Sequence, residues 1–253
     1  MSEIRIVAFA DLDARTWGFG WFAEPGAPAQ LAVSQGSDAQ LLDATLESAE
    51  DDPWRLEGDG LSLQVTPTGA TGHGGTSEEL QTLDQGCTVS GQVSLPAGTV
   101  ELQSPGWRSS ARSLSDLDRI GSFRWAAGWL GPHHGFSLLA LRPRRARGQE
   151  ADLLAASVID DPPVPRIDDP RLSTTYDEAR LPVRVGLELW LEAEPTTDED
   201  ADAPPQYPRR AAGQVVSQGP ELTAAGFGLH GSLMHWHSHD QEGPGVYLLG
   251  QRR

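Results

Sequence analysis

The pattern that most constrains the fold is an alternation of apolar and polar residues with a period of two, which runs through most of the chain. Successive side chains of a β-strand point to opposite faces, so this alternation is typical of a strand with one buried face. Apolar residues at helical spacing are rare. The alternation predicts strands over residues 4–10, 16–23, 60–66, 88–94, 99–103, 122–130, 136–142, 183–192, 228–237 and 245–251. We therefore expect an all-β fold.

Turn-forming residues separate these strands. Glycine (28 residues) and proline (19 residues) are both more frequent than in an average soluble domain. Three segments between the strands are especially rich in turn-forming or charged residues. They are 66–86, rich in Gly and Thr; 160–182, rich in Asp and Pro; and 194–210, acidic and rich in Pro. The last of these is the segment with the composition of a disordered region.

The charged residues exclude several classes of function. All 19 basic residues are arginine, so reactions that need a lysine, such as Schiff-base formation and the anchoring of pyridoxal phosphate, are ruled out. The formal net charge of −17 would repel a phosphate backbone. Nucleic acids and anionic membrane surfaces are therefore not expected as partners.

The sequence also carries an expectation about location. Cys87 is the only cysteine, so no disulfide can form within the chain. The start, MSEIRIVAF, lacks the basic and apolar regions of a signal peptide. Both features favour a reducing, cytoplasmic location. No stretch of about 18 apolar residues occurs, so membrane insertion is not expected.

Segments of the first half recur in the second half in the same order. Residues 20–22 resemble 128–130, 41–46 resemble 153–158, 60–65 resemble 186–191, and 89–91 resemble 229–231. The offset grows along the chain, as insertions in a second copy would produce; the alternative is chance similarity between alternating strands. An internal duplication predicts two tandem antiparallel barrels over 1–115 and 116–253. The insertions of the second barrel would be loops at 143–149, 160–182 and 194–210.

Aromatic residues gather on one face of two predicted strands. The residues concerned are Trp17, Phe19 and Trp21 in one strand and Phe123, Trp125 and Trp129 in the other. Such rings suit the wall of an apolar pocket, so all six are candidates for ligand binding. The alternative is that they pack in the core between two sheets.

Candidate acid–base residues lie on two later strands. His235 and His237 share one face of the strand 228–237, and Glu188 lies beside Trp190 on the strand 183–192. These histidines and this carboxylate are the predicted proton donors and acceptors, with Trp190 and Trp236 as further ligand-binding residues. If Glu188 faces solvent, it has no such role.

A metal centre is an alternative interpretation of the histidines. Two histidines on one strand can reach a single metal ion, but a third ligand must come from elsewhere in the chain. His73, His133, His134 or Glu188 could supply it. No second motif fixes this ligand, so we predict a site without metal or cofactor.

The tandem β units resemble a known group of proteins. The features that carry the resemblance are Trp17-Gly-Phe-Gly-Trp21, its echo in Phe123-Arg-Trp-Ala-Ala-Gly-Trp129, and the His- and Trp-rich strand before Gly245-Val-Tyr-Leu248. They are similar to the tandem lipocalin-like, calycin-type proteins of the carotenoid 1,2-hydratase (CrtC) and AttH-like group. The resemblance implies two barrels side by side and, in several members, cofactor-free hydration or cyclisation of polyenes and related natural products. No catalytic residue of the group can be matched to a position in this chain.

The predicted function is binding of a hydrophobic small molecule, with hydration, isomerisation or cyclisation as the reaction it would undergo. His235, His237 and Glu188 would exchange the proton. One alternative is a non-catalytic carrier or structural protein of the same fold. The other is a metal-dependent enzyme that uses the strand of His235 and His237.

Overall fold

The computed structural model describes residues 2–22, 26–48, 53–77, 79–113, 117–131, 134–148, 152–160, 164–192 and 208–253. These residues form 16 β-strands and one short 3-10 helix, η1 (Leu117–Arg119). The prediction of an all-β fold is confirmed. Among the described residues no helix is long and apolar enough to span a membrane.

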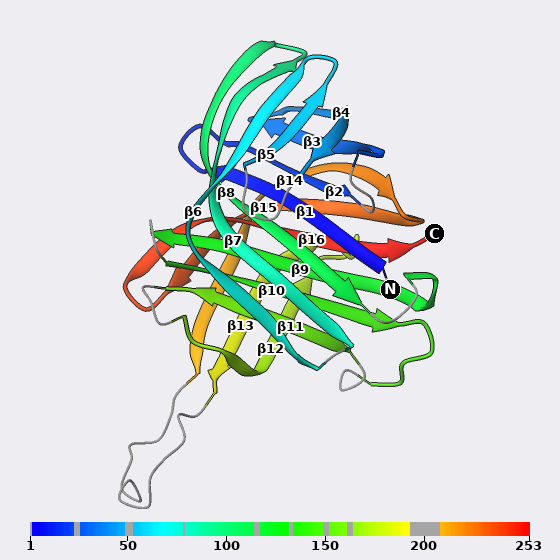
Figure 1. Cartoon of the computed structure of the whole chain (residues 1–253), viewed down its shortest axis with the longest axis vertical. Helices are drawn as coiled ribbons and strands as arrows, with labels where there is room; N and C mark the ends of the chain where they lie inside the picture. Colours follow the sequence, from blue (N-terminus) through cyan, green and yellow to red (C-terminus); the bar gives the residue numbers. More distant parts are fainter. Residues whose placement is uncertain are drawn as a thin grey trace, which may run out of the picture.

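The first eight strands form a closed antiparallel barrel (Figure 1). They are β1 (Ser2–Asp11), β2 (Thr16–Phe22), β3 (Pro28–Gln35), β4 (Asp38–Glu47), β5 (Trp54–Gly58), β6 (Leu61–Ser77), β7 (Leu80–Leu95) and β8 (Gly98–Ser113). Each strand pairs with the next, and β1 pairs with β8 to close the barrel. Side chains such as Val7, Phe9 and Val89 fill its interior.

The other eight strands form a second antiparallel sheet. They are β9 (Ile120–Gly131), β10 (His134–Pro143), β11 (Leu153–Ile159), β12 (Ile167–Tyr176), β13 (Pro182–Leu191), β14 (Arg209–Ala224), β15 (Phe227–Ser238) and β16 (Gln241–Arg252). Their order, β11-β10-β9-β16-β15-β14-β13-β12, repeats the up-and-down order of the barrel. The second sheet is open between β11 and β12, the third and fourth strands of its half.

The repeated order revises the matches between the two halves. By its place in the sheet, β9 corresponds to β1, yet the sequence match pairs Trp129 of β9 with Trp21 of β2. Likewise 41–46 lie in β4, the fourth strand, and 153–158 in β11, the third. Only 89–91 and 229–231 lie on equivalent strands, β7 and β15. Alternating strands resemble one another whatever their place in a sheet, so three of the four matches are off by one strand.

The predicted loop insertions have different outcomes. Segment 160–182 was predicted to be a loop, and this is wrong because β12 occupies Ile167–Tyr176. Among the described strands, β12 pairs with β13 alone, and such an edge strand tolerates its Pro170 and its exposed acidic residues. Residues 144–148 do form a turn and coil between β10 and β11. Of 194–210, Arg209 and Arg210 begin β14, and 194–207 lie outside the described residues.

The far ends of β6 and β7 run past the barrel and lie across the second sheet (Figure 1). There β6 contacts both β11 and β12, the two strands beside the opening. Glycine permits this close approach. A Cβ atom at Gly72 would lie 2.8 Å from Ser157 Cβ, and one at Gly74 would lie 2.9 Å from the carbonyl oxygen of Ala156.

Candidate functional site

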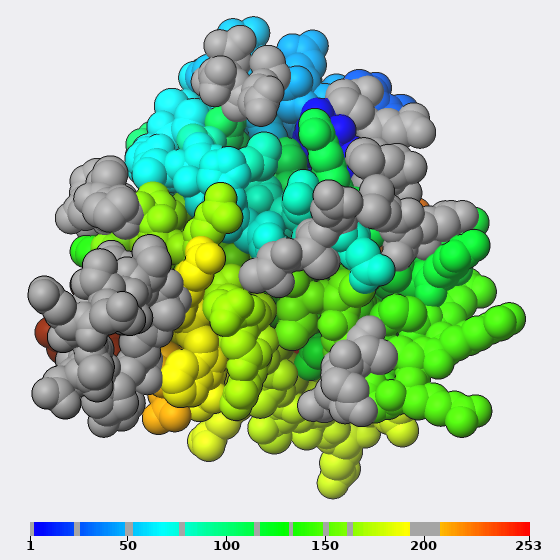
Figure 2. Space-filling model, turned by 60° about the horizontal axis from the view of Figure 1, so that its bottom comes forward, coloured from blue at the N-terminus to red at the C-terminus, as the bar shows by residue number. Residues whose placement is uncertain are grey.

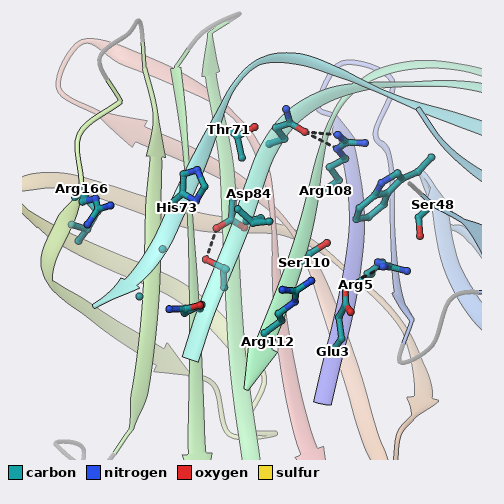
Figure 3. Close-up of a pocket in the computed structure, with 18 of the residues that line it drawn as sticks. Glu3, Arg5, Ser48, Thr71, His73, Asp84, Arg108, Ser110, Arg112 and Arg166 are labelled. Carbon is teal, nitrogen blue, oxygen red and sulfur yellow. Dashed lines mark hydrogen bonds and ion pairs between the residues drawn. The ribbon is translucent and has the colours of Figure 1, made fainter. Parts of the chain in front are cut away.

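A polar cleft of about 780 Å³ lies where the barrel meets the second sheet. β1, β6, β7 and β8 supply most of its wall, and Arg166, Asp168 and Glu192 of the second half complete it. Figure 2 shows the cyan surface of β6 and β7 beside the yellow-green surface of the second sheet, and Figure 3 shows the cleft from close by. The volume falls within the range of about 300–1,000 Å³ that is usual for small-molecule sites.

Strand alternation explains why the cleft is polar. The face of β1 that puts Val7 and Phe9 into the barrel continues, two residues at a time, to Arg5 and Glu3. In β8 the face that carries Leu102 inside the barrel continues to Arg108 and then to Ser110 and Arg112. The cleft is therefore the polar extension of the barrel's inner face beyond its apolar core.

Arg108 forms the floor of the cleft. The residue is 4% exposed. Its Nε and Nη2 atoms donate to Gln85 Oε1 at 2.8 and 2.5 Å, and its Cζ lies 5.1 Å from the centroid of the Trp54 ring. Contacts on two sides hold the guanidinium in one orientation, beside an apolar ring.

Further cationic and polar groups surround Arg108. Four arginines line the cleft among the residues that the structure describes: Arg5, Arg108, Arg112 and Arg166. Arg5 Nη2 pairs with Glu3 at 3.0 Å. By contrast, the buried Arg5 Nη1 and Ser48 Oγ have no hydrogen-bond partner among the described residues. These two atoms are therefore able to bond to a ligand or to water.

Asp84 ties the wall of the cleft to the second sheet. The residue is 1% exposed. It accepts hydrogen bonds from Thr82 Oγ1 and Ser157 Oγ, each at 2.7 Å, and from Trp107 Nε1 at 3.4 Å. Ser157 belongs to β11, so this buried carboxylate links β7 to the second sheet.

Among the described residues that line the cleft, His73 is the one histidine. It lies on β6, opposite Leu83 of β7, and its side chain is exposed (Figure 3). An imidazole can both donate and accept a proton near neutral pH. His73 and Arg108 thus supply one proton-transfer group and one fixed cation around the same cavity.

The six aromatic residues that were predicted to bind a ligand lie outside the cleft. Trp17, Phe19, Trp21, Phe123, Trp125 and Trp129 all belong to the hydrophobic cluster between the two sheets, and none is more than 7% exposed. Trp21 stacks on Phe123 with ring centroids 4.3 Å apart, and Trp129 Nε1 donates to the carbonyl oxygen of Gly106. The structure brings these rings together as the contact between the sheets, which is the packing alternative. A ligand-binding role for them stays a prediction.

The predicted acid–base residues also lie away from the cleft. Glu188 and Trp190 are on the outer face of β13, where Glu188 Oε1 is 3.0 Å from Arg210 Nε. His235 and His237 are on the outer face of β15, with side chains 34% and 53% exposed. Their roles in catalysis stay predictions.

Trp236 and His134 do not line the cleft either. Trp236 points inside the second sheet, with its ring centroid 4.9 Å from that of Phe136. His134, considered as a metal ligand, pairs with Asp160 at 3.0 Å. His133 lies outside the described residues.

Solved structures share this arrangement of a barrel and a second sheet. A structure of CghA with Sch210972 covers 99% of this chain and 89% of its own length, with 10% sequence identity and a TM-score of 0.64. An AttH-like protein from Nitrosomonas europaea covers 100% and 93%, with 12% identity and a TM-score of 0.64. Kievitone hydratase from Nectria haematococca covers 99% and 88%, with 8% identity and a TM-score of 0.58.

The chain has the tandem lipocalin-like fold of the AttH/CrtC-like group. No protein-family model and no curated protein matches the sequence, so the likeness rests on structure. In this tandem lipocalin-like chain, the cleft around Arg108 combines a fixed cation, an apolar ring and an exposed imidazole.

Proposed function

We propose that this chain binds a small organic molecule in the cleft around Arg108 and catalyses its hydration, isomerisation or cyclisation by acid–base chemistry. The volume of the cleft and its polar groups support binding of a small molecule. The similar folds include kievitone hydratase and the complex of CghA with Sch210972. These likenesses support the reaction class, and the residues of the cleft supply its chemistry.

The observation that carries the proposal is the buried, oriented guanidinium of Arg108. Gln85 and Trp54 hold it at the floor of the cleft, so binding a ligand oxygen costs little further ordering. A guanidinium of this kind favours a carboxylate, an enolate or a polarised carbonyl oxygen. The ligand would be a small organic molecule that places such an oxygen against Arg108 and an apolar part of its carbon frame against Trp54.

A hydration in this cleft can be written with the groups present. His73 takes a proton from a water molecule as the water oxygen bonds to one carbon of a conjugated double bond. The electron pair of that bond moves onto the carbonyl oxygen, where Arg108 stabilises the negative charge. His73 then returns the proton to the neighbouring carbon, so one molecule of water has been added. Moving a proton between carbons without water would give an isomerisation.

Binding can be tested with 8-anilinonaphthalene-1-sulfonate, an aromatic anion that fluoresces in apolar sites. Arg108→Met removes the cation that the sulfonate would contact. The dissociation constant of the dye should therefore rise at least about tenfold, which is a loss of about 1.4 kcal/mol of binding free energy. Arg112→Met, which replaces an exposed arginine of the same cleft, provides a second variant that leaves the core intact.

Arg210→Met is the matched control, because Arg210 is an exposed arginine that pairs with Glu188 outside the cleft. Circular dichroism should first establish that each variant has the wild-type fold. Equal binding of the dye by wild type, Arg108→Met, Arg112→Met and Arg210→Met would contradict the proposed site.

The same cleft would serve a non-catalytic carrier, so the reaction needs its own test. Native mass spectrometry of protein purified from its own host should reveal a bound molecule, which is then released and incubated with the protein in ¹⁸O-labelled water. A product with added labelled water indicates a hydratase, and a product of unchanged mass but altered retention indicates an isomerase or cyclase. Recovery of the unaltered molecule alone would favour the carrier.

A further inference from the structure

Two histidines and a glutamate meet on the outer face of the hairpin formed by β15 and β16. His235 and His237 are two residues apart on β15, so their side chains share one face, with ring centroids 4.3 Å apart. Glu242 of β16 is paired in register with His237. In Figure 1 this hairpin turn lies at the end of the orange and red strands that is away from the C-terminus.

The ligand atoms of these residues have separations that suit a shared metal ion. Glu242 Oε2 is 3.4 Å from His237 Nδ1 and 3.6 Å from His235 Nε2, and all three atoms lie within 4.8 Å of one another. In a tetrahedral zinc site, bonds of about 2.0–2.2 Å put neighbouring ligand atoms about 3.3–3.5 Å apart. Small rotations of the imidazole rings would therefore complete the geometry.

The surroundings leave room for a cation. The neighbouring strand β14 presents Ala212 opposite His237 and Gln214 opposite His235, so neither register position carries a positive charge. The two imidazoles are partly exposed, so an ion can enter from solvent and a water molecule can take the fourth position.

We propose that His235, His237 and Glu242 form a surface binding site for one divalent transition-metal ion of the Zn²⁺ class. Two imidazoles and one carboxylate favour Zn²⁺, Ni²⁺ or Cu²⁺, whereas Ca²⁺ and Mg²⁺ require oxygen ligands. None of the three residues lines the cleft around Arg108, so the metal site does not depend on the proposed function. It joins neighbouring strands, so bound metal would also stabilise the folded state.

Calorimetric titration of ZnCl₂ into tag-free protein, in a buffer that does not chelate metals, tests this site. Wild-type protein should bind one equivalent of Zn²⁺ and should melt at a higher temperature in its presence. His237→Ala and Glu242→Gln each remove one of three ligands, so the affinity for Zn²⁺ should fall at least about 100-fold, the upper end of the loss caused by removing an outer-shell contact. Both variants should also lose the increase in melting temperature.

His230→Ala is the matched control. His230 lies on the same strand, its side chain is 32% exposed, and its Nε2 is 3.4 Å from Glu221 Oε2 of β14. Among the described residues, no second histidine shares that carboxylate. This variant should bind Zn²⁺ as the wild type does. Absence of saturable binding by the wild type, unchanged binding by His237→Ala, or an equal loss in His230→Ala would each overturn the proposal.

Discussion

At the scale of single residues, burial decides what the polar groups of the cleft can do. Arg108 and Asp84 are both almost fully buried. Gln85 and Trp54 orient Arg108 at the cavity, whereas hydroxyl and indole donors already bond to Asp84. We therefore assign ligand binding to Arg108 and a structural role to Asp84.

Asp84→Ala should lower the free energy of unfolding by about 2–4 kcal/mol, because buried donors on Thr82, Ser157 and Trp107 lose their acceptor. Asp84→Asn keeps an acceptor oxygen and the shape of the side chain, so its cost should be clearly smaller. Urea denaturation of both variants measures the difference. A loss below about 0.5 kcal/mol for Asp84→Ala, the size of an ordinary surface change, would show that the network does not stabilise the fold.

The thiol of Cys87 should be inert in the native protein. Cys87 is 3% exposed, and its burial raises the pKa of the thiol well above its usual value, although the nearby Arg108 acts in the opposite direction. Because the thiolate is the reactive form, 5,5′-dithiobis(2-nitrobenzoic acid) at pH 8 should modify Cys87 only after unfolding. Rapid reaction of the folded protein would contradict this expectation.

At the scale of elements, the alternation of apolar and polar residues predicted strands that have one apolar face. It missed strand segments that lack such a face. Segment 66–86 was interpreted as a turn because it is rich in glycine, yet it holds the far ends of β6 and β7. Its glycines serve the close approach to β11. For this reason His73 and Asp84 were not predicted as cleft residues. Arg108 was not predicted because the end of β8 carries polar residues on both faces.

The contacts that each strand face makes could not be predicted from one strand at a time. The aromatic faces that contain Trp21 and Phe123 were identified correctly as faces, but only the packing of two sheets shows that they meet each other. Similarly, the partner of His235 and His237 is Glu242, whose place beside them follows from the β15–β16 register.

Gly74→Val tests the role of glycine in the long hairpin. A Cβ atom at Gly74 would lie 2.4 Å from Thr82 Oγ1 and 2.9 Å from the backbone oxygen of Ala156. The side chain would separate β6 from β11, so the free energy of unfolding should fall by about 1–3 kcal/mol, as for other overpacked sites. Gly86→Ala is the control, since its Cβ would meet only Thr68 Oγ1, at 3.8 Å. Equal stability of the two variants in urea denaturation would contradict the close-packing argument.

At the scale of the whole molecule, five of the eight tryptophans lie between the two halves and join them: Trp17, Trp21, Trp107, Trp125 and Trp129. The cluster between the sheets includes side chains from β1 and β2 and from β9, β15 and β16. The Asp84 hydrogen bond to Ser157 adds a buried polar link across the same boundary. Both contacts require the halves to be folded at the same time.

The protein should therefore unfold in one cooperative transition. Phe123→Ala removes the ring that stacks on Trp21 and meets Phe227, and it should cost about 3–5 kcal/mol. Differential scanning calorimetry should show one transition for wild type and variant, at a lower temperature for the variant. Val216→Ala, at a site 45% exposed, should leave the melting temperature nearly unchanged. Two separate transitions in the wild type would show that the halves fold independently.

The opening between β11 and β12 has a consequence for dividing the chain. In the intact protein, β6 of the barrel lies beside both of these strands. A fragment that begins after the barrel would expose two unpaired strand edges, which readily pair with the edges of other molecules. Expressed by itself, the C-terminal half should therefore aggregate. A soluble truncated protein would have to include the β6–β7 hairpin.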